Sequence, residues 1–106
     1  MVDPNQFEIP PSFIALYVAP GQSRPSAARA EIAQRYELCE DMAQHLVELA
    51  RAQWQDLGIA EEDVLQRCHD GLLAPRAVVS EPQARWVVRR LAELQGWEDP
   101  TWLACP

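Results

Sequence analysis

The chain has 106 residues and a formal net charge of −7, with 48% hydrophobic and 24% charged residues. This length is typical of one domain with a single core, and the negative charge disfavours nucleic acids and anionic membranes as partners. The nine residues counted as lysine or arginine are all arginine, which excludes sites built on a lysine amine, such as a P-loop or a pyridoxal phosphate attachment.

The first eight residues, MVDPNQFE, lack the positive region and the long apolar stretch of a secretory signal. The longest apolar run, Phe13 to Ala19, is too short to span a bilayer core of about 30 Å. The chain has three widely separated cysteines, Cys39, Cys68 and Cys105, which is not the pattern of a disulfide framework. We therefore expect a cytoplasmic protein with reduced thiols and no membrane association.

The N-terminal residues 1–25 contain five prolines, too many for a long helix. The same stretch has too many apolar side chains for a solvated tail. We expect a proline-rich, apolar and partly ordered arm that buries these side chains against the domain. Two forms fit the pattern, a short helix from about Pro11 to Val18 with proline in its first turn, or an extended strap.

A long helix is predicted from Ser26, a suitable N-cap, to Leu57, where Gly58 can take the left-handed conformation that ends helices. The apolar stripe has helical spacing and comprises Ile32, Tyr36, Cys39, Ala43, Leu46, Ala50 and Leu57, with Met42 and Leu49 beside it. Such a helix would be about 45 Å long. We expect one end to project or to serve a partner.

A second helix is predicted to begin after Ala60, where three consecutive acids complement the positive end of the helix dipole. Ile59 and Val64 hold the positions of a hydrophobic staple, and Gly71 is expected to end the helix. The following residues, 72–79, are mostly apolar. We expect this connection to lie against the core.

The third helix has the clearest start, because Ser80 and Gln83 form a capping box with proline between them. Its apolar face comprises Ala84, Val87, Val88, Leu91 and Leu94. Gly96 is expected to end it, and Trp97 to fold back on its last turn in a Schellman contact.

Together these segments predict an all-α fold, a small three- to four-helix bundle with the proline-rich arm at its N-terminus. The expected organisation is the arm at residues 1–25, a helical domain at 26–97, and a C-terminal tail at 98–106 pinned in part by Trp102. The sequence contains no internal repeat.

The glycines are too far apart for a phosphate-binding loop, and the histidines and cysteines lack the spacing of common zinc motifs. Helical spacing places Glu37, Asp41, His45 and Glu48 along one face, where they could bind a metal or act as acid and base. The same spacing is typical of a solvated helical face. We expect the solvated face, and so predict no catalytic residue, cofactor site or metal ligand.

An arginine cluster marks the third helix. Arg85 and Arg89 share one face, while Trp86 and Arg90 share the neighbouring one. Guanidinium groups beside an indole suit phosphate binding and base stacking. The alternative is that these arginines pair with acids of the first two helices, and the link of residues 71–80 is too long for a helix-turn-helix.

The chain has four tryptophans, more than one small core needs, so we expect some of them at an interface. For each one, packing in the core is the alternative. Tryptophan and arginine are enriched at interface hot spots. The candidate interaction surface therefore comprises Phe13, Tyr17, Trp54, Arg85, Trp86, Arg89 and Arg90.

Three stretches taken together are similar to a known family: residues 7–25 (FEIPPSFIALYVAPGQSRP), 35–44 (RYELCEDMAQ) and 71–97 (GLLAPRAVVSEPQARWVVRRLAELQGW). The chain resembles a family of short, uncharacterised bacterial proteins, some of which carry the automatic label of an ATPase with chaperone activity. The resemblance implies a small helical protein and carries over no site residues. The ATPase label does not fit a chain without lysine or a glycine-rich loop.

Three functions follow as hypotheses. The preferred one is a non-enzymatic interaction or adaptor module that binds an unknown protein partner or forms a homodimer. The second is an anion or nucleic-acid binder that uses the arginine cluster of the third helix. The third is a metal-assisted enzyme that uses the carboxylates and the histidine of the first long helix.

Overall fold

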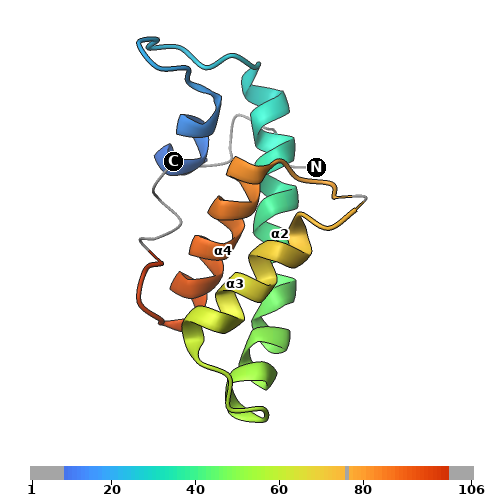
Figure 1. The fold of residues 1–106 in the computed structure, drawn as a ribbon. Helices are drawn as coiled ribbons and strands as arrows, with labels where there is room; N and C mark the ends of the chain where they lie inside the picture. The colour runs from blue at the N-terminus through green and yellow to red at the C-terminus, as the bar shows by residue number, and fades with distance from the viewer. Residues whose placement is uncertain (1–8, 76, 101–106) are drawn as a thin grey trace.

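The structure is a computed structural model that describes residues 9–75 and 77–100. Within these ranges it contains helices and no strand, in the order α1 (Pro11–Ile14), the 3-10 helix η2 (Ala15–Tyr17), α2 (Arg29–Gln55), α3 (Glu61–Leu72) and α4 (Glu81–Gln95). The expected all-α bundle is confirmed (Figure 1). Trp102 and Cys105 lie outside the described residues.

Helix α2 forms the long axis of the molecule. It has 27 residues, whereas α3 has 12 and α4 has 15, so α2 is about 40 Å long in a molecule whose largest extent is 43 Å. Both α3 and α4 lie against α2, and its last turns reach beyond them (Figure 1). No helix in the described part combines the length and apolar character needed to cross a membrane.

The ends of α2 differ from the prediction. The helix begins at Arg29 after the extended residue Ala28, which provides no side-chain cap. Ser26 is not the N-cap because it lies two residues before Ala28. Its N–H donates instead to the Tyr17 carbonyl at 2.6 Å and closes the loop between Tyr17 and Ser26. At the other end the helix stops at Gln55, before Leu57.

Helix α3 begins after Ala60, as predicted, but continues through Gly71 and ends at Leu72. The prediction that the glycine ends this helix is therefore wrong. Gly71 has no positive φ, and the N–H of Leu73 bonds the Asp70 carbonyl at 3.2 Å. The helix ends after the glycine, and Leu72 and Leu73 pack against the core there.

The caps of α4 are confirmed. The Ser80 hydroxyl accepts a hydrogen bond from the Gln83 N–H at 3.3 Å, and the Gln83 side-chain oxygen accepts one from the Ser80 N–H at 3.0 Å. Gly96 has a φ of +73°, which favours glycine. The Trp97 N–H bonds the Ala92 carbonyl at 2.8 Å, which completes a Schellman turn.

The core consists of two adjoining clusters of apolar side chains. The first joins α2 and α4 to the N-terminal arm, and its buried residues are Ile9, Phe13, Ile32, Ala33, Cys39, Ala43, Val79, Ala84, Trp86 and Val87. The second joins α2, α3 and α4, and its buried residues are Ala50, Val64, Leu65, Cys68, Val88, Leu91 and Ala92. Ile59 packs beside Val64 in the second cluster, as the staple predicts.

The arm is held to the bundle by Phe13, which is fully buried. Its ring lies 5.1 Å from the Trp86 ring and 5.7 Å from the Tyr36 ring, both in edge-to-face geometry. Of the two forms expected for the arm, the structure has the short helix. The predicted burial of its apolar side chains is confirmed for Ile9 and Phe13.

Two predicted core segments are more exposed than expected. Leu49 is 51% exposed although the next residue, Ala50, is fully buried, so Leu49 lies on the side of α2 that faces away from the core. Leu57 follows the end of α2 and is 68% exposed. In the connection before α4, Val79 is buried but Val78 is 60% exposed. The expected burial of this connection therefore holds only for its two ends.

We predict that Phe13→Ala lowers the free energy of unfolding by about 3 to 5 kcal/mol, because it leaves a cavity beside the rings of Tyr17, Tyr36 and Trp86. The exposed Leu57 provides the matched control, since Leu57→Ala is expected to change it by less than about 0.5 kcal/mol. Urea unfolding followed by circular dichroism measures both. Equal losses in the two variants would show that the arm is not part of the core.

Candidate interaction groove on helix α4

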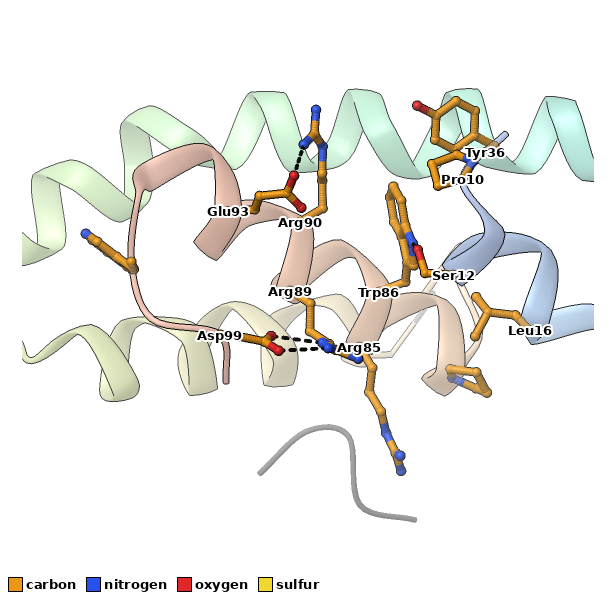
Figure 2. Close-up of a pocket in the computed structure, with 12 residues that line it drawn as sticks. Pro10, Ser12, Leu16, Tyr36, Arg85, Trp86, Arg89, Arg90, Glu93 and Asp99 are labelled. Carbon is orange, nitrogen blue, oxygen red and sulfur yellow. Dashed lines mark hydrogen bonds and ion pairs between the residues drawn. The ribbon is translucent and has the colours of Figure 1, made fainter. Parts of the chain in front are cut away.

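An open groove of about 620 Å³ runs along the outer face of α4, between α1 and the residues that follow α4 (Figure 2). Its lining combines apolar and charged side chains: Pro10, Ser12, Leu16, Tyr36, Pro82, Arg85, Trp86, Arg89, Arg90, Glu93, Trp97 and Asp99. The groove is the candidate functional site because it gathers four of the seven residues predicted for an interaction surface.

The periodicity of α4 places these side chains. Ala84, Val87, Val88 and Leu91 are fully buried against the bundle, so the helical period places Arg85 and Arg89 away from this buried face. Arg89 therefore emerges on the outer face, while Arg90 turns toward α2 (Figure 2).

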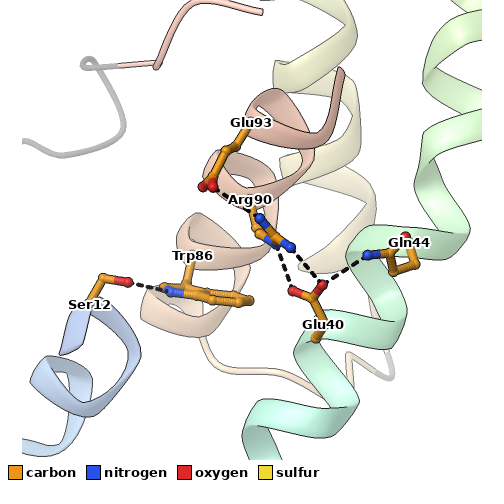
Figure 3. A network of polar contacts seen from close by, with 6 residues as sticks. All are labelled: Ser12, Glu40, Gln44, Trp86, Arg90 and Glu93. Carbon is orange, nitrogen blue, oxygen red and sulfur yellow. Dashed lines mark hydrogen bonds and ion pairs between the residues drawn. The ribbon is translucent and has the colours of Figure 1, made fainter. Parts of the chain in front are cut away.

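Trp86 forms the fixed floor of the groove. Its side chain is only 8% exposed, and its ring lies 5.7 Å from the Tyr36 ring as well as against Phe13. The indole N–H donates to the Ser12 hydroxyl at 3.0 Å, so a residue of α1 provides the hydrogen-bond acceptor for the indole (Figure 3). The indole is held in one orientation before any ligand arrives.

The expected interaction surface needs correction at its N-terminal members. Phe13 is fully buried and offers nothing to a partner, because the arm folds onto α4. Tyr17 is half-buried, and its hydroxyl accepts a hydrogen bond from the Gln83 side-chain amide at 3.0 Å. The Gln83 oxygen in turn accepts from Arg35 at 2.7 Å. Tyr17 therefore belongs to the contact between arm and bundle.

Trp54 lies outside the groove, near the projecting end of α2. It is 41% exposed, and its ring centre is 5.9 Å from that of Trp97, which does line the groove. The two indoles therefore connect the end of the groove with the exposed end of α2.

Arg90 joins α4 to α2. Its guanidinium donates to both carboxylate oxygens of Glu40, at 2.8 and 3.1 Å, and to Glu93 at 3.0 Å (Figure 3). The hydrogen bond from Arg90 lowers the pKa of Glu40, and Gln44 supports the same carboxylate at 2.9 Å. The expectation that these arginines pair with acids of the first helices is confirmed for Arg90.

Arg89 has a different partner. Its guanidinium makes a two-pronged contact with Asp99, from Nε at 3.0 Å and from Nη2 at 2.8 Å (Figure 2). The hydrogen bond from Arg89 lowers the pKa of Asp99. The two side chains are 44% and 51% exposed, and exposed pairs of this kind contribute little to stability.

Arg85 pairs with Glu81 one turn earlier on α4, at 2.5 Å. The same Glu81 oxygen lies 3.6 Å from His69 Nε2 on α3. The ion pair between Arg85 and Glu81 lies within α4, whereas pairing with acids of the first two helices was expected.

The alternative acid–base or metal cluster on α2 consists of four exposed side chains, Glu37, Asp41, His45 and Glu48. His45 Nδ1 lies 2.7 Å from the backbone carbonyl oxygen of Asp41. Within residues 9–75 and 77–100, no three histidine, cysteine or acidic side chains come together in a way that could hold a metal ion. The structure places these four side chains along a solvated helical face.

The two described cysteines are free thiols in the core. Burial raises the pKa of the Cys39 thiol to about 11 and also raises that of Cys68. Both thiols are therefore protonated at neutral pH, which is the opposite of an activated nucleophile.

Sequence reasoning missed Ser12 and Asp99 as site residues. Ser12 follows two prolines, and no local pattern shows that its hydroxyl meets an indole 74 positions away. A signal was present for Asp99, because Glu98 and Asp99 follow the Schellman turn of a helix with an arginine-rich face. A chain that turns back there can reach that face.

Comparisons of the chain with protein families, with curated proteins and with solved structures give no match. The resemblance to short bacterial proteins therefore stays a prediction. The groove has to be interpreted from its own geometry and charges.

We predict that Glu40→Gln lowers the free energy of unfolding by about 1 kcal/mol at pH 7, because it weakens the bond to Arg90. Since folding lowers the pKa of Glu40, its contribution is present above the pKa of an unfolded glutamate and lost as pH falls through the folded pKa. The difference between variant and native chain should shrink below about pH 4.

Urea unfolding at several pH values measures this difference. The control is Glu93→Gln, since Glu93 is 71% exposed and its removal should have a small effect at every pH. A difference for Glu40→Gln that stays constant down to about pH 3 would contradict the role given to this carboxylate.

Proposed function

We propose that the chain is a non-catalytic protein–protein interaction module whose docking surface is the groove on α4. The observation that carries this proposal is the grouping of Arg85, Arg89 and Arg90 with the indoles of Trp86 and Trp97 in one open groove. Arginine and tryptophan dominate interface hot spots, where an apolar floor is surrounded by a polar rim.

The rigidity of the floor supports the proposal. Trp86 is fixed by ring contacts on two sides and by the hydrogen bond to Ser12. A partner that packs against this indole would not have to order it, so less of the contact free energy is lost on binding.

The charges in the groove favour recognition over catalysis. Hydrogen bonds between Arg89 and Asp99 raise the pKa of the first and lower that of the second. Both groups therefore hold a fixed charge at neutral pH, whereas a general acid or base needs a pKa close to the working pH. Fixed charges suit a docking surface.

The cytoplasmic location is part of this proposal. Its support is the pair of unbridged thiols in the core, Cys39 and Cys68, since reduced cysteines are the usual state in that compartment. A partner there could be a different protein or a second copy of this chain.

A second candidate function is the binding of anions or nucleic acid by the same arginines. The proximity of Arg85, Arg89 and Trp86 favours it, while the net charge of −7 and the carboxylates paired with these arginines oppose it. If the chain has this function, a nucleic-acid column should retain it, with less retention at higher salt and less for the Arg89→Gln variant. Absence of retention would exclude nucleic-acid binding.

We predict that a protein recovered with the tagged chain from its native cell is lost in Arg89→Glu, with affinity at least about tenfold lower. The matched control is Arg67→Glu, at an exposed position on α3 outside the groove, which should retain the partner. Light scattering after size exclusion shows whether that partner is a second copy.

Two outcomes would count against the proposal. One is a strict monomer from which no partner is recovered at any salt concentration. The other is a partner that binds Arg89→Glu and Arg67→Glu equally well, since it would dock away from the groove.

A further inference from the structure

One carboxylate in the groove comes from outside the helices. Gly96 and the Schellman turn redirect the chain after α4, and Asp99 then reaches back across ten positions to Arg89 (Figure 2). It meets the guanidinium in the two-pronged arrangement that arginine makes with carboxylates. Arg89 is thus a carboxylate-binding group, and the carboxylate that it binds in this structure is Asp99, from the chain's own C-terminal segment.

The contact is easier to open than its neighbour. Arg89 and Asp99 are 44% and 51% exposed, whereas Arg90 and Glu40 are 28% and 18% exposed. Water and salt compete with the first pair much more effectively than with the second. Of these two arginines, Arg89 is therefore the one that can exchange its carboxylate.

Each arginine of the groove is paired with a carboxylate: Arg85 with Glu81, Arg89 with Asp99, and Arg90 with Glu40 and Glu93. Two of these acids, Glu93 and Asp99, line the groove themselves. Movement of Asp99 out of the groove would leave Glu93 as the remaining acid among them. An incoming carboxylate would replace a carboxylate, so that the charge of the occupied groove is unchanged.

We propose that Arg89 binds an acidic segment of a partner protein, and that Asp99 occupies this position in the free chain until an aspartate or glutamate of the partner displaces it. This inference rests on the proposed function and names the chemistry of the partner. The apolar side chains of Leu16 and Trp86 form the adjoining wall and floor, so an apolar residue beside the acid completes the segment.

A protein segment fits this groove better than a nucleic acid does. A phosphate chain places a charge at every nucleotide, and it would meet Glu93 in the groove and Glu81 next to Arg85. A peptide can present one carboxylate to Arg89 and uncharged atoms elsewhere. The exchange of one acid for another needs no other change in the charges of the groove.

The test uses a capped peptide, Gly-Trp-Glu-Asp-Pro, which copies residues 96–100 and so carries the acid that already fits Arg89. A second peptide, Gly-Trp-Gln-Asn-Pro, in which both acids are replaced by their amides, is the matched probe. Titration of the labelled full chain is followed by nuclear magnetic resonance at the Arg89 Nε–H and the Trp86 indole N–H.

Asp99→Asn removes the internal competitor, so it should bind the acidic peptide about two- to fivefold more tightly than the native chain. The matched control, Glu98→Gln, changes an exposed acid that does not line the groove, and should bind as the native chain does. Adding Arg89→Gln to Asp99→Asn should abolish the shifts at the indole.

Three outcomes would overturn the inference: equal affinity of Asp99→Asn and the native chain, equal binding of the amide peptide and the acidic peptide, or tighter binding of a thymidine oligonucleotide than of the acidic peptide. Failure here is distinct from failure of the proposed function. A cellular partner that is lost in Arg89→Glu but gains nothing from Asp99→Asn would leave the docking groove in place and remove only the displacement of Asp99.

Discussion

The packing of the Phe13 ring between Tyr36 and Trp86 is the contact on which the rest of this molecule depends. It fixes the arm against α2 and α4, and the arm then supplies Pro10 and Leu16 to the wall of the groove. The same contact brings Ser12 to the Trp86 indole. One buried aromatic side chain thus completes the core and also creates a side of the groove that α4 cannot provide itself.

Arg89 and Arg90 are adjacent in sequence and have opposite roles. A helical step of about 100° turns Arg90 toward α2, where partial burial and Glu40 tie it into the bundle. Arg89 faces outward to Asp99 and solvent. The strength of an ion pair depends on its surroundings. The exposed Arg89 is therefore the arginine that our proposal assigns to recognition, whereas Arg90 is committed to the fold.

Part of the site follows from the sequence. The four-residue spacing on a capped helix groups Arg85 and Arg89 beside Trp86, and all three line one groove. Phe13 is buried, as the apolar character of the arm predicts, but its place on an interaction surface is wrong because its ring packs against Tyr36 and Trp86 and is fully buried. The predicted Ser26 cap is also wrong, because α2 begins only at Arg29, after the extended residue Ala28.

The sequence by itself determined the helical class, the start and end of α4 and the start of α3. These features depend on capping boxes, glycine C-caps and first-turn acids, and each such signal involves residues no more than about four positions apart. Tertiary structure alone decided where the arm docks and which arginine is committed to the fold. Those outcomes depend on contacts between residues 50 and 74 positions apart. Such contacts are selected by packing and burial in three dimensions, and no spacing along the chain encodes them.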